Sequence, residues 1–209
     1  MKTLTTTTGE QRVTLHGLTW QQYQEILNAL PQTRAAHLIF DRGILEITMP
    51  LEEHEFASEL MGLFLRILVV ETGLRLRSLR STALWRPDLK RGAEPDNAYY
   101  IHHQPQVAGR SIDLSIDPPP DLVIEVDMTH TDIDKNQLYA ALGVPELWRY
   151  NGREWQIFQL WDGCYQGCDR SPLFPWVPKE CLYRFLAEAK MDEVEAEKNW
   201  RRWVQEQRP

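Results

Sequence analysis

The chain has 209 residues, with 23 Lys and Arg against 30 Asp and Glu, a formal charge of −7, and 43% hydrophobic residues. This length and balance predict one globular domain with a sizeable core, and they exclude a fibrous, low-complexity or wholly disordered protein. The acidic balance argues at first against a polyanionic partner, because nucleic-acid binding depends on Lys and Arg.

The apolar stretches of the sequence indicate its compartment. The longest apolar run, residues 60–70, contains Arg66 and is shorter than the roughly 20 residues of a membrane helix. The Thr-rich residues 1–9 lack the apolar segment of a secretory signal. We therefore expect a soluble, cytoplasmic protein with a flexible N-terminal tract over residues 1–12. Three cysteines are too few to predict a disulfide framework: Cys164, Cys168 and Cys181.

The first part of the chain predicts a helix, a hairpin and a long helix. Apolar residues at helical spacing favour a short helix over residues 20–30. Residues 37–40 and 44–49 are typical of strands, and Gly43 between them allows a tight turn. Residues 52–72 carry an apolar stripe of the width expected for a helix packed on a sheet.

Three extended segments follow: residues 74–85, 94–101 and 121–127. The last of these is apolar enough to be a buried strand. A helix capped by Thr131 and Asp132 is predicted to run to Leu142, before an extended segment over 145–150. The predicted core order is therefore helix, three strands, helix, strand, in an α/β fold with a mixed sheet.

The C-terminal part is predicted to contain a strand meander and helices. We expect the meander over residues 154–165 and helices over 179–207, after a Pro-interrupted loop over 171–178. Trp200, Trp203 and Val204 form an apolar group that either packs on its own domain or meets its copy in a homodimer.

Glu125 interrupts the apolar run 121–127, and a carboxylate in a buried strand is costly unless it is paired or binds a cation. By the period of two, Glu125 and Asp127 share one face of their strand. If the strand containing Asp96 is its antiparallel neighbour, two like charges lie close together. A hard divalent cation such as Mg²⁺ would remove their repulsion, which makes Asp96 and Glu125 a candidate metal-binding pair. In the alternative, Asp96 only follows Pro95 in a turn.

Under that alternative, Glu125 pairs with an arginine such as Arg80 or Arg86. Lys135 favours the metal site, because it lies at helical spacing with the apolar Leu138, Tyr139 and Leu142. An inward ammonium there could orient a nucleophile or offset transition-state charge. The competing interpretation is that its stem covers apolar surface while the ammonium reaches solvent.

The predicted core order and three motifs carry a resemblance: Glu94-Pro95-Asp96, Asp121-Leu-Val-Ile-Glu125-Val and Tyr139-Ala-Ala-Leu-Gly-Val-Pro-Glu-Leu-Trp148. The chain resembles the PD-(D/E)XK nuclease superfamily, and within it the family of putative restriction endonuclease domains. The resemblance implies a nuclease domain over residues 13–178, followed by a C-terminal helical extension over 179–209.

The resemblance also implies catalytic roles for Asp96, Glu125 and Lys135, with Mg²⁺, or Mn²⁺, held by Asp96 and Glu125. Asp127 stands where the superfamily pattern has its lysine, and Lys135 on the following helix replaces that lysine. A further acid often comes from the first core helix, where Glu55 and Glu59 are both candidates; Asp127 is a third.

The segment 75–91 holds six basic residues against one acid, a local charge of +5. With Trp85 among them, it predicts a groove that follows a phosphate backbone and stacks a base. The competing interpretation is a charged strand edge with Trp85 in the core. The nucleic-acid contact candidates are Arg75, Arg77, Arg80, Trp85, Arg86, Lys90 and Arg91.

Together these residues predict a Mg²⁺-dependent endonuclease that hydrolyses nucleic acid, most readily DNA. The local charge of +5 removes the objection raised by the net charge. The alternative is a module that kept the nuclease fold, lost turnover and binds nucleic acid or a partner protein. Asp127 in place of the lysine favours the alternative, whereas the presence of all three catalytic candidates favours the enzyme.

Overall fold

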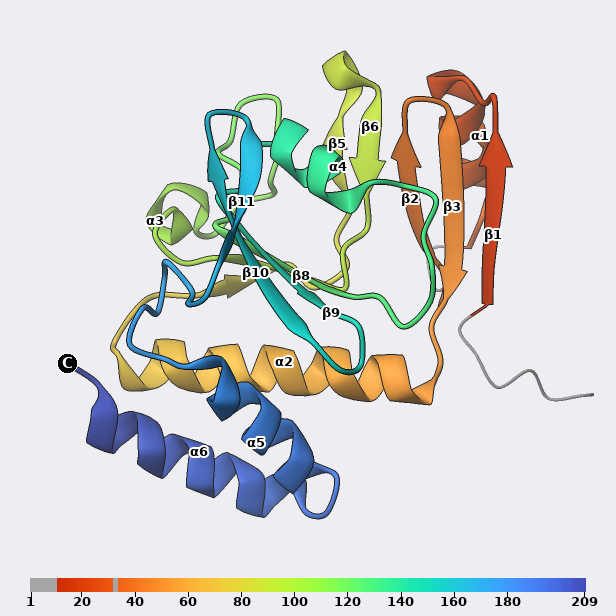
Figure 1. Cartoon of the computed structure of the whole chain (residues 1–209). Helices are drawn as coiled ribbons and strands as arrows, with labels where there is room; N and C mark the ends of the chain where they lie inside the picture. The colour runs from red at the N-terminus through yellow and green to blue at the C-terminus, as the bar shows by residue number, and fades with distance from the viewer. Residues whose placement is uncertain (1–10, 32–33) are drawn as a thin grey trace, which may run out of the picture.

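The computed structural model describes residues 11–31 and 34–209, which form two β-sheets and the helices around them (Figure 1). The smaller sheet contains, in order, β1 (Gln11–His16), β3 (Ile44–Met49), β2 (His37–Asp41), β6 (Arg91–Ala93) and β5 (Leu84–Arg86). The larger sheet contains, in order, β11 (Cys164–Cys168), β10 (Trp155–Trp161), β9 (Glu146–Tyr150), β8 (Leu122–Val126), β7 (Asn97–Tyr100) and β4 (Arg77–Ser78). The helices are α1 (Trp20–Ala29), α2 (Glu52–Glu71), the short 3₁₀ helix η1 (Pro87–Leu89), α3 (Gln104–Val107), α4 (Lys135–Ala141), α5 (Lys179–Ala189) and α6 (Glu193–Gln207).

The predicted core order is confirmed as α2, β4, β7, β8, α4 and β9. Strand β7 pairs with β8 in the antiparallel direction, as predicted, and β8 pairs with β9 in the parallel direction across the connection made by α4. The sheet is therefore mixed, and the fold is of the α+β, restriction-endonuclease-like kind.

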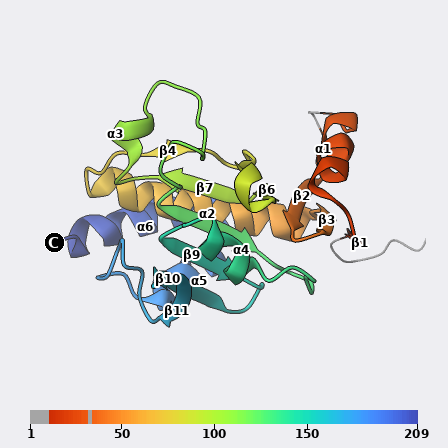
Figure 2. The ribbon, with the colours of Figure 1, turned by 90° about the horizontal axis from the view of Figure 1, so that it is seen from above.

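The larger sheet is covered on both faces. Leu122, Ile124 and Val126 of β8 pack with α2, whereas Val123 packs with Leu138 of α4 on the opposite face. Figure 2 shows the strands lying across α2, with β1, β2, β3 and α1 grouped at one end of that helix. Residues of β8 that point toward α4 therefore lie between the sheet and a second layer, where a charged side chain is shielded from water.

The predicted extended segment 74–85 is divided between the two sheets. Its first part forms β4 at the edge of the larger sheet, and its last residues belong to β5 at the edge of the smaller sheet. The chain changes direction at Arg80, which has φ 51°. Strands β1 and β6 and helix α3 were not predicted. Of the expected flexible tract 1–12, residues 1–10 lie outside the described residues, and the last two belong to β1.

The predicted caps of α4 are wrong. The helix begins at Lys135, and its N-cap is Asp134, whose side chain accepts the Gln137 N–H at 3.0 Å. The Thr131 hydroxyl donates instead to the buried carboxylate of Glu46, at 3.0 Å. That hydroxyl ties the loop before α4 to strand β3 of the smaller sheet.

The predicted C-terminal helices over 179–207 are confirmed as α5 and α6, which separate where Asp192 ends the turn after α5 and caps α6. Both helices lie against α2 (Figure 1), and α5 also reaches the larger sheet, where the Tyr183 hydroxyl accepts the Trp155 N–H of β10 at 2.9 Å. Trp200 is 3% exposed and stacks on Phe64 of α2, with ring centroids 4.2 Å apart. Trp200 and Val204 therefore pack on their own domain and do not form a surface patch for a dimer. None of the helices in residues 11–31 and 34–209 is long and apolar enough to span a bilayer.

Candidate active site

The register of β7 and β8 places Asp96 opposite Glu125. Asn97 is the partner of Ile124 in this antiparallel pair. Asp96, one residue before Asn97, therefore faces Glu125, one residue after Ile124. Directly opposite residues have their side chains on the same face. Asp96 is 9% exposed and Glu125 1%, and Asp96 Oδ2 accepts the Val126 N–H at 2.6 Å. The predicted pair is therefore together and buried.

Glu125 is held by two residues of α4. Lys135 Nζ lies 2.6 Å from Glu125 Oε2, and the Tyr139 hydroxyl donates to Oε1. Burial, together with the charges of Asp96 and Asp127, raises the pKa of Glu125 to about 7 even though Lys135 opposes the shift. The carboxyl is therefore partly protonated near neutral pH, and a cation bound beside it would favour its ionised form.

The alternative partners of Glu125 are wrong. Arg80 lies 3.6 Å from Glu59, and Arg86 binds Asp88 at 2.7 Å. Glu125 instead contacts Lys135 and Tyr139.

Lys135 points inward, as its helical phase predicts, and is 4% exposed. Its ammonium also lies 2.5 Å from Asp127 Oδ1. Burial alone would lower the pKa of Lys135, but Asp127 and Glu125 raise it above its ordinary value. These two carboxyl groups therefore favour the protonated, positively charged form of the side chain.

Asp127 links this lysine to strand β9. Arg149 donates to Asp127 Oδ2 through Nε at 3.0 Å and Nη2 at 2.9 Å. Although burial would raise the pKa of Asp127, Lys135 and Arg149 lower it. Asp127, which stands in place of the superfamily lysine, thus holds two cations in position.

Two histidines that sequence reasoning missed contact Asp96. His54 Nε2 lies 3.2 Å from Asp96 Oδ2, and His37 Nδ1 lies 3.3 Å from Oδ1. Burial would raise the pKa of Asp96, but His37 and His54 lower it well below its ordinary range. A signal for His54 was available, because it lies three and seven residues before Ala57 and Met61 on the buried stripe of α2.

The two glutamates considered on this helix lie elsewhere. Glu55 and Glu59 are exposed, and Glu59 is near Arg80. Helix α2 therefore presents His54 to Asp96, and neither glutamate lies on that face.

The residues present fit a hard divalent cation held by few protein ligands. Asp96, Glu125 and Asp127 bring three buried carboxyl groups together beside the cations of Lys135 and Arg149. In the part of the chain that the structure describes, no group of three or more His, Cys, Asp and Glu side chains is arranged to hold a metal. Mg²⁺ commonly binds through one or two carboxylates and completes its shell with water, which suits Asp96 and Glu125.

The basic segment is more dispersed than its sequence suggests. Arg77 donates to the Val107 carbonyl, and Arg91 Nε lies 2.6 Å from Asp41. Trp85 is 44% exposed, so its placement in the core is wrong. In the described residues, Arg75 and Lys90 form no ion pair, which leaves them available to phosphates.

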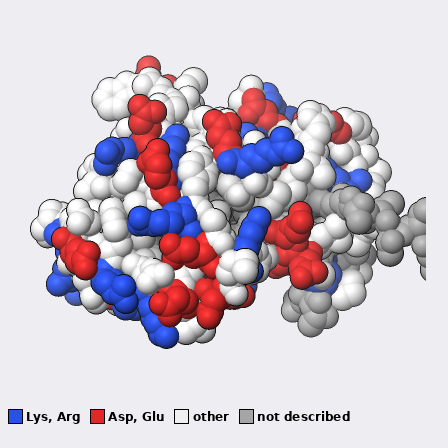
Figure 3. Space-filling model, turned by 60° about the horizontal axis from the view of Figure 1, so that its bottom comes forward, with Lys and Arg blue, Asp and Glu red and all other residues white. Residues whose placement is uncertain are grey.

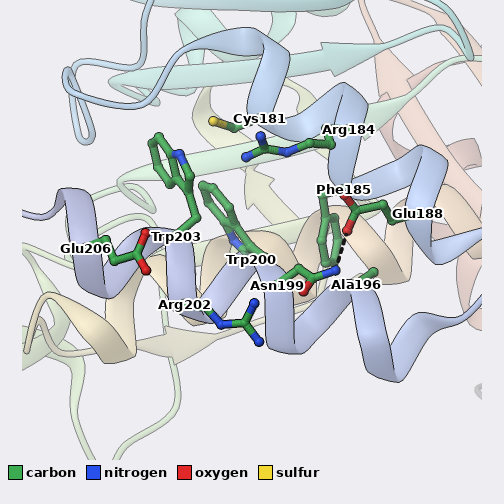
Figure 4. A pocket seen from close by; sticks show the side chains of 10 residues that line it. All are labelled: Cys181, Arg184, Phe185, Glu188, Ala196, Asn199, Trp200, Arg202, Trp203 and Glu206. Atoms are coloured by element: carbon green, nitrogen blue, oxygen red, sulfur yellow. Dashed lines mark hydrogen bonds between the residues drawn. The ribbon is translucent and has the colours of Figure 1, made fainter.

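The C-terminal helices contain a separate cavity. It has a volume of about 240 Å³, lies between α5 and α6, and is lined in part by Phe185, Trp200 and Trp203 (Figure 4). All of its lining residues belong to α5 and α6, and none of them is a candidate of the active site. Lys and Arg are interspersed with Asp and Glu on the face seen from below (Figure 3). This face therefore lacks the single-sign surface that a phosphate backbone requires.

The core order and the buried pair of Asp96 and Glu125, with Lys135 from the next helix, define a protein of the restriction-endonuclease-like class. The family model described as Uma2, putative restriction endonuclease, matches residues 20–182, and the chain belongs to this family. A comparison with curated proteins finds no match. The matched region contains every catalytic candidate and supports a nuclease-like function.

Proposed function

We propose that the protein is a Mg²⁺-dependent endonuclease that hydrolyses phosphodiester bonds of DNA. The observation that carries the proposal is the buried pair of Asp96 and Glu125, opposite each other on β7 and β8, with Lys135 Nζ 2.6 Å from Glu125. Family membership supports the same chemistry.

Asp96 and Glu125 would hold the cation. When bound, a divalent cation neutralises charge on the phosphate and activates water for attack on phosphorus. Mn²⁺ could replace Mg²⁺, since both prefer oxygen ligands.

The surrounding side chains keep these carboxylates in one orientation. Val126 N–H, His37 and His54 contact Asp96, while Tyr139 and Lys135 contact Glu125. Fixed ligands lose little conformational freedom on binding, which favours a pre-organised site.

Lys135 contributes charge. Because its pKa is raised, its ammonium stays protonated and can offset the negative charge that builds on the phosphate oxygens in the transition state. Asp127, which is itself held by Arg149, contacts this ammonium from the other side and keeps it from turning toward solvent.

DNA contact is assigned to the basic candidates and to Trp85. Arg75 and Lys90 are exposed, and Arg80 is only loosely paired with Glu59, so all three can follow a phosphate backbone. Trp85 offers a stacking surface.

The test is incubation of the purified protein with plasmid, single-stranded DNA and RNA, in Mg²⁺, Mn²⁺ or EDTA. We expect metal-dependent cleavage of DNA that is lost in Glu125→Gln and in Asp96→Asn. His130→Ala is the control, since its side chain is 89% exposed. Cleavage that persists undiminished in both carboxylate variants would overturn the site.

A second candidate function rests on the Lys135–Asp127 contact of 2.5 Å. If this ion pair never opens, the ammonium cannot turn to a phosphate, and the protein is a nucleic-acid-binding module without turnover. Binding of DNA without cleavage under any metal condition would favour this second function.

A further inference from the structure

A cavity of about 670 Å³ lies where the edges of the two sheets separate. One wall is the connection between β4, the edge strand of the larger sheet, and β5, the edge strand of the smaller sheet. The facing wall is the segment 111–114 before β8. The cavity is thus built by the basic segment and one loop, and it is distinct from the cavity between α5 and α6.

The chemistry of its walls favours a flat, uncharged ring over a phosphate. The aliphatic part of the lining consists of Leu79, Ala83, Leu84, Ile112 and Leu114. The only basic side chain among the lining residues, Arg77, already donates to the Val107 carbonyl. Asp113 contributes a carboxylate, whose Oδ1 accepts from the N–H and the hydroxyl of Ser115. An anion would be repelled by Asp113, whereas a ring that carries amino groups could donate to it.

Trp85 supplies a rigid platform at this cavity. It lies directly opposite Gly92 in the β5–β6 pair, and a Cβ at position 92 would be 3.0 Å from the Cδ1 atom of Trp85. The Cδ1 edge of the indole therefore lies close to the Gly92 backbone, yet the side chain is 44% exposed. An aromatic ring fixed in this way can stack on a ligand with little loss of conformational entropy.

The cavity adjoins the candidate active site along β7. The Leu79 N–H donates to the Ala98 carbonyl at 2.8 Å, and Ala98 is two residues from Asp96. At about 3.3 Å per residue, this separation is roughly 7 Å along the strand. One wall of the cavity is therefore hydrogen-bonded to the strand that directly follows Asp96.

We propose that this cavity receives an unstacked nucleobase of the strand being cut, with Trp85 as its stacking platform. The inference rests on the proposed nuclease function and specifies its substrate class: nucleic acid with a single-stranded or extruded nucleotide beside the scissile bond. A base inside an intact duplex cannot enter the cavity, because its faces are covered by its neighbours.

The experiment measures binding in EDTA, so that it does not depend on cleavage. Fluorescence anisotropy is recorded for a labelled single-stranded oligodeoxynucleotide and for its duplex. We expect Trp85→Ala to weaken single-strand binding about tenfold and duplex binding by less than about twofold. Trp85→Phe keeps a ring and should retain most of the affinity. Trp161→Ala, at a site 65% exposed on β10, is the matched control and should change neither affinity.

Ala83→Phe tests the cavity separately from the tryptophan. Its ring fills the space beside Leu84 while Trp85 stays, and the same single-strand loss is expected. Three outcomes would overturn the base site. The affinity could fall equally for single strand and duplex, it could fall for neither, or the unaltered protein could fail to bind single-stranded DNA. A selective loss in a protein that never cleaves would leave the base site standing and overturn only the nuclease function.

Discussion

The ammonium of Lys135 lies 2.6 Å from the carboxylate of Glu125, although one residue begins helix α4 and the other lies near the end of strand β8. Both side chains are almost fully buried, and the same ammonium reaches Asp127 at 2.5 Å. One cation therefore compensates two buried carboxylates, so its removal has consequences for stability as well as for activity.

Lys135→Met should destabilise the fold by about 3 kcal/mol, because it leaves Glu125 without a cation and Asp127 with Arg149 alone. Adding Glu125→Gln removes one orphaned charge and should restore part of that stability, while cleavage stays lost. Urea unfolding measures the first effect and plasmid cleavage the second. Lys90→Met, at an exposed position, is the control and should change stability by less than about 0.5 kcal/mol. If the changes in the free energy of unfolding simply add in the double variant, the two residues are not coupled.

His54→Ala should lower kcat for cleavage about tenfold and leave KM nearly unchanged. The reason is that His54 positions Asp96 and does not itself bind the substrate. His54→Gln keeps an N–H donor and should recover part of the rate. Steady-state kinetics on plasmid DNA separates the two constants. A change confined to KM would show that His54 binds substrate instead.

The inward lysine was predictable because its evidence is local. Lys135 shares a helical face with Leu138 and Tyr139, and both of these are fully buried. Glu125 was predictable for a similar reason, since a lone carboxylate in an apolar strand needs a partner. Residues whose role depends on the phase of one helix or one strand can be found from the sequence.

The remaining contacts of the site join distant parts of the chain. His37 comes from the smaller sheet and Arg149 from β9, and no local pattern links either of them to Asp96 or Asp127. The division of segment 74–85 between the two sheets could not be predicted either. The chain turns at Arg80 with a positive φ, and no glycine marks the turn in the sequence. These features depend on how the two sheets meet.

Glu146 predicts a pH dependence of stability away from the active site. Burial raises its pKa from 4.5 to about 6, despite hydrogen bonds from Ser171, Trp148 and the Leu173 N–H. The folded protein therefore holds this proton more tightly than the unfolded chain. Its contribution to the free energy of unfolding is complete below pH 4.5 and is lost as the pH rises through 6, by ~2 kcal/mol.

The measurement is the difference in the free energy of unfolding between the unaltered protein and Glu146→Gln, which cannot titrate. Relative to this variant, the unaltered protein should lose ~2 kcal/mol between acid and neutral pH. Glu154→Gln, at an exposed site, should show no such difference. A constant difference across the pH range would mean that Glu146 titrates alike in both states.

Trp200 tests whether the C-terminal helices unfold together with the sheet. Its ring stacks on Phe64 at 4.2 Å, and its Nε1 donates to the Phe64 carbonyl at 3.1 Å. Trp200→Ala should therefore lower the free energy of unfolding of the whole domain by about 4 kcal/mol. Trp200→Phe keeps the stack and should cost about 1 kcal/mol, for the lost hydrogen bond. Trp161→Ala, which is 65% exposed in the parent, should be nearly neutral. Urea unfolding followed by circular dichroism gives one transition if α6 shares the core; a separate early transition in Trp200→Ala, with the main one unmoved, would show that the helices unfold on their own.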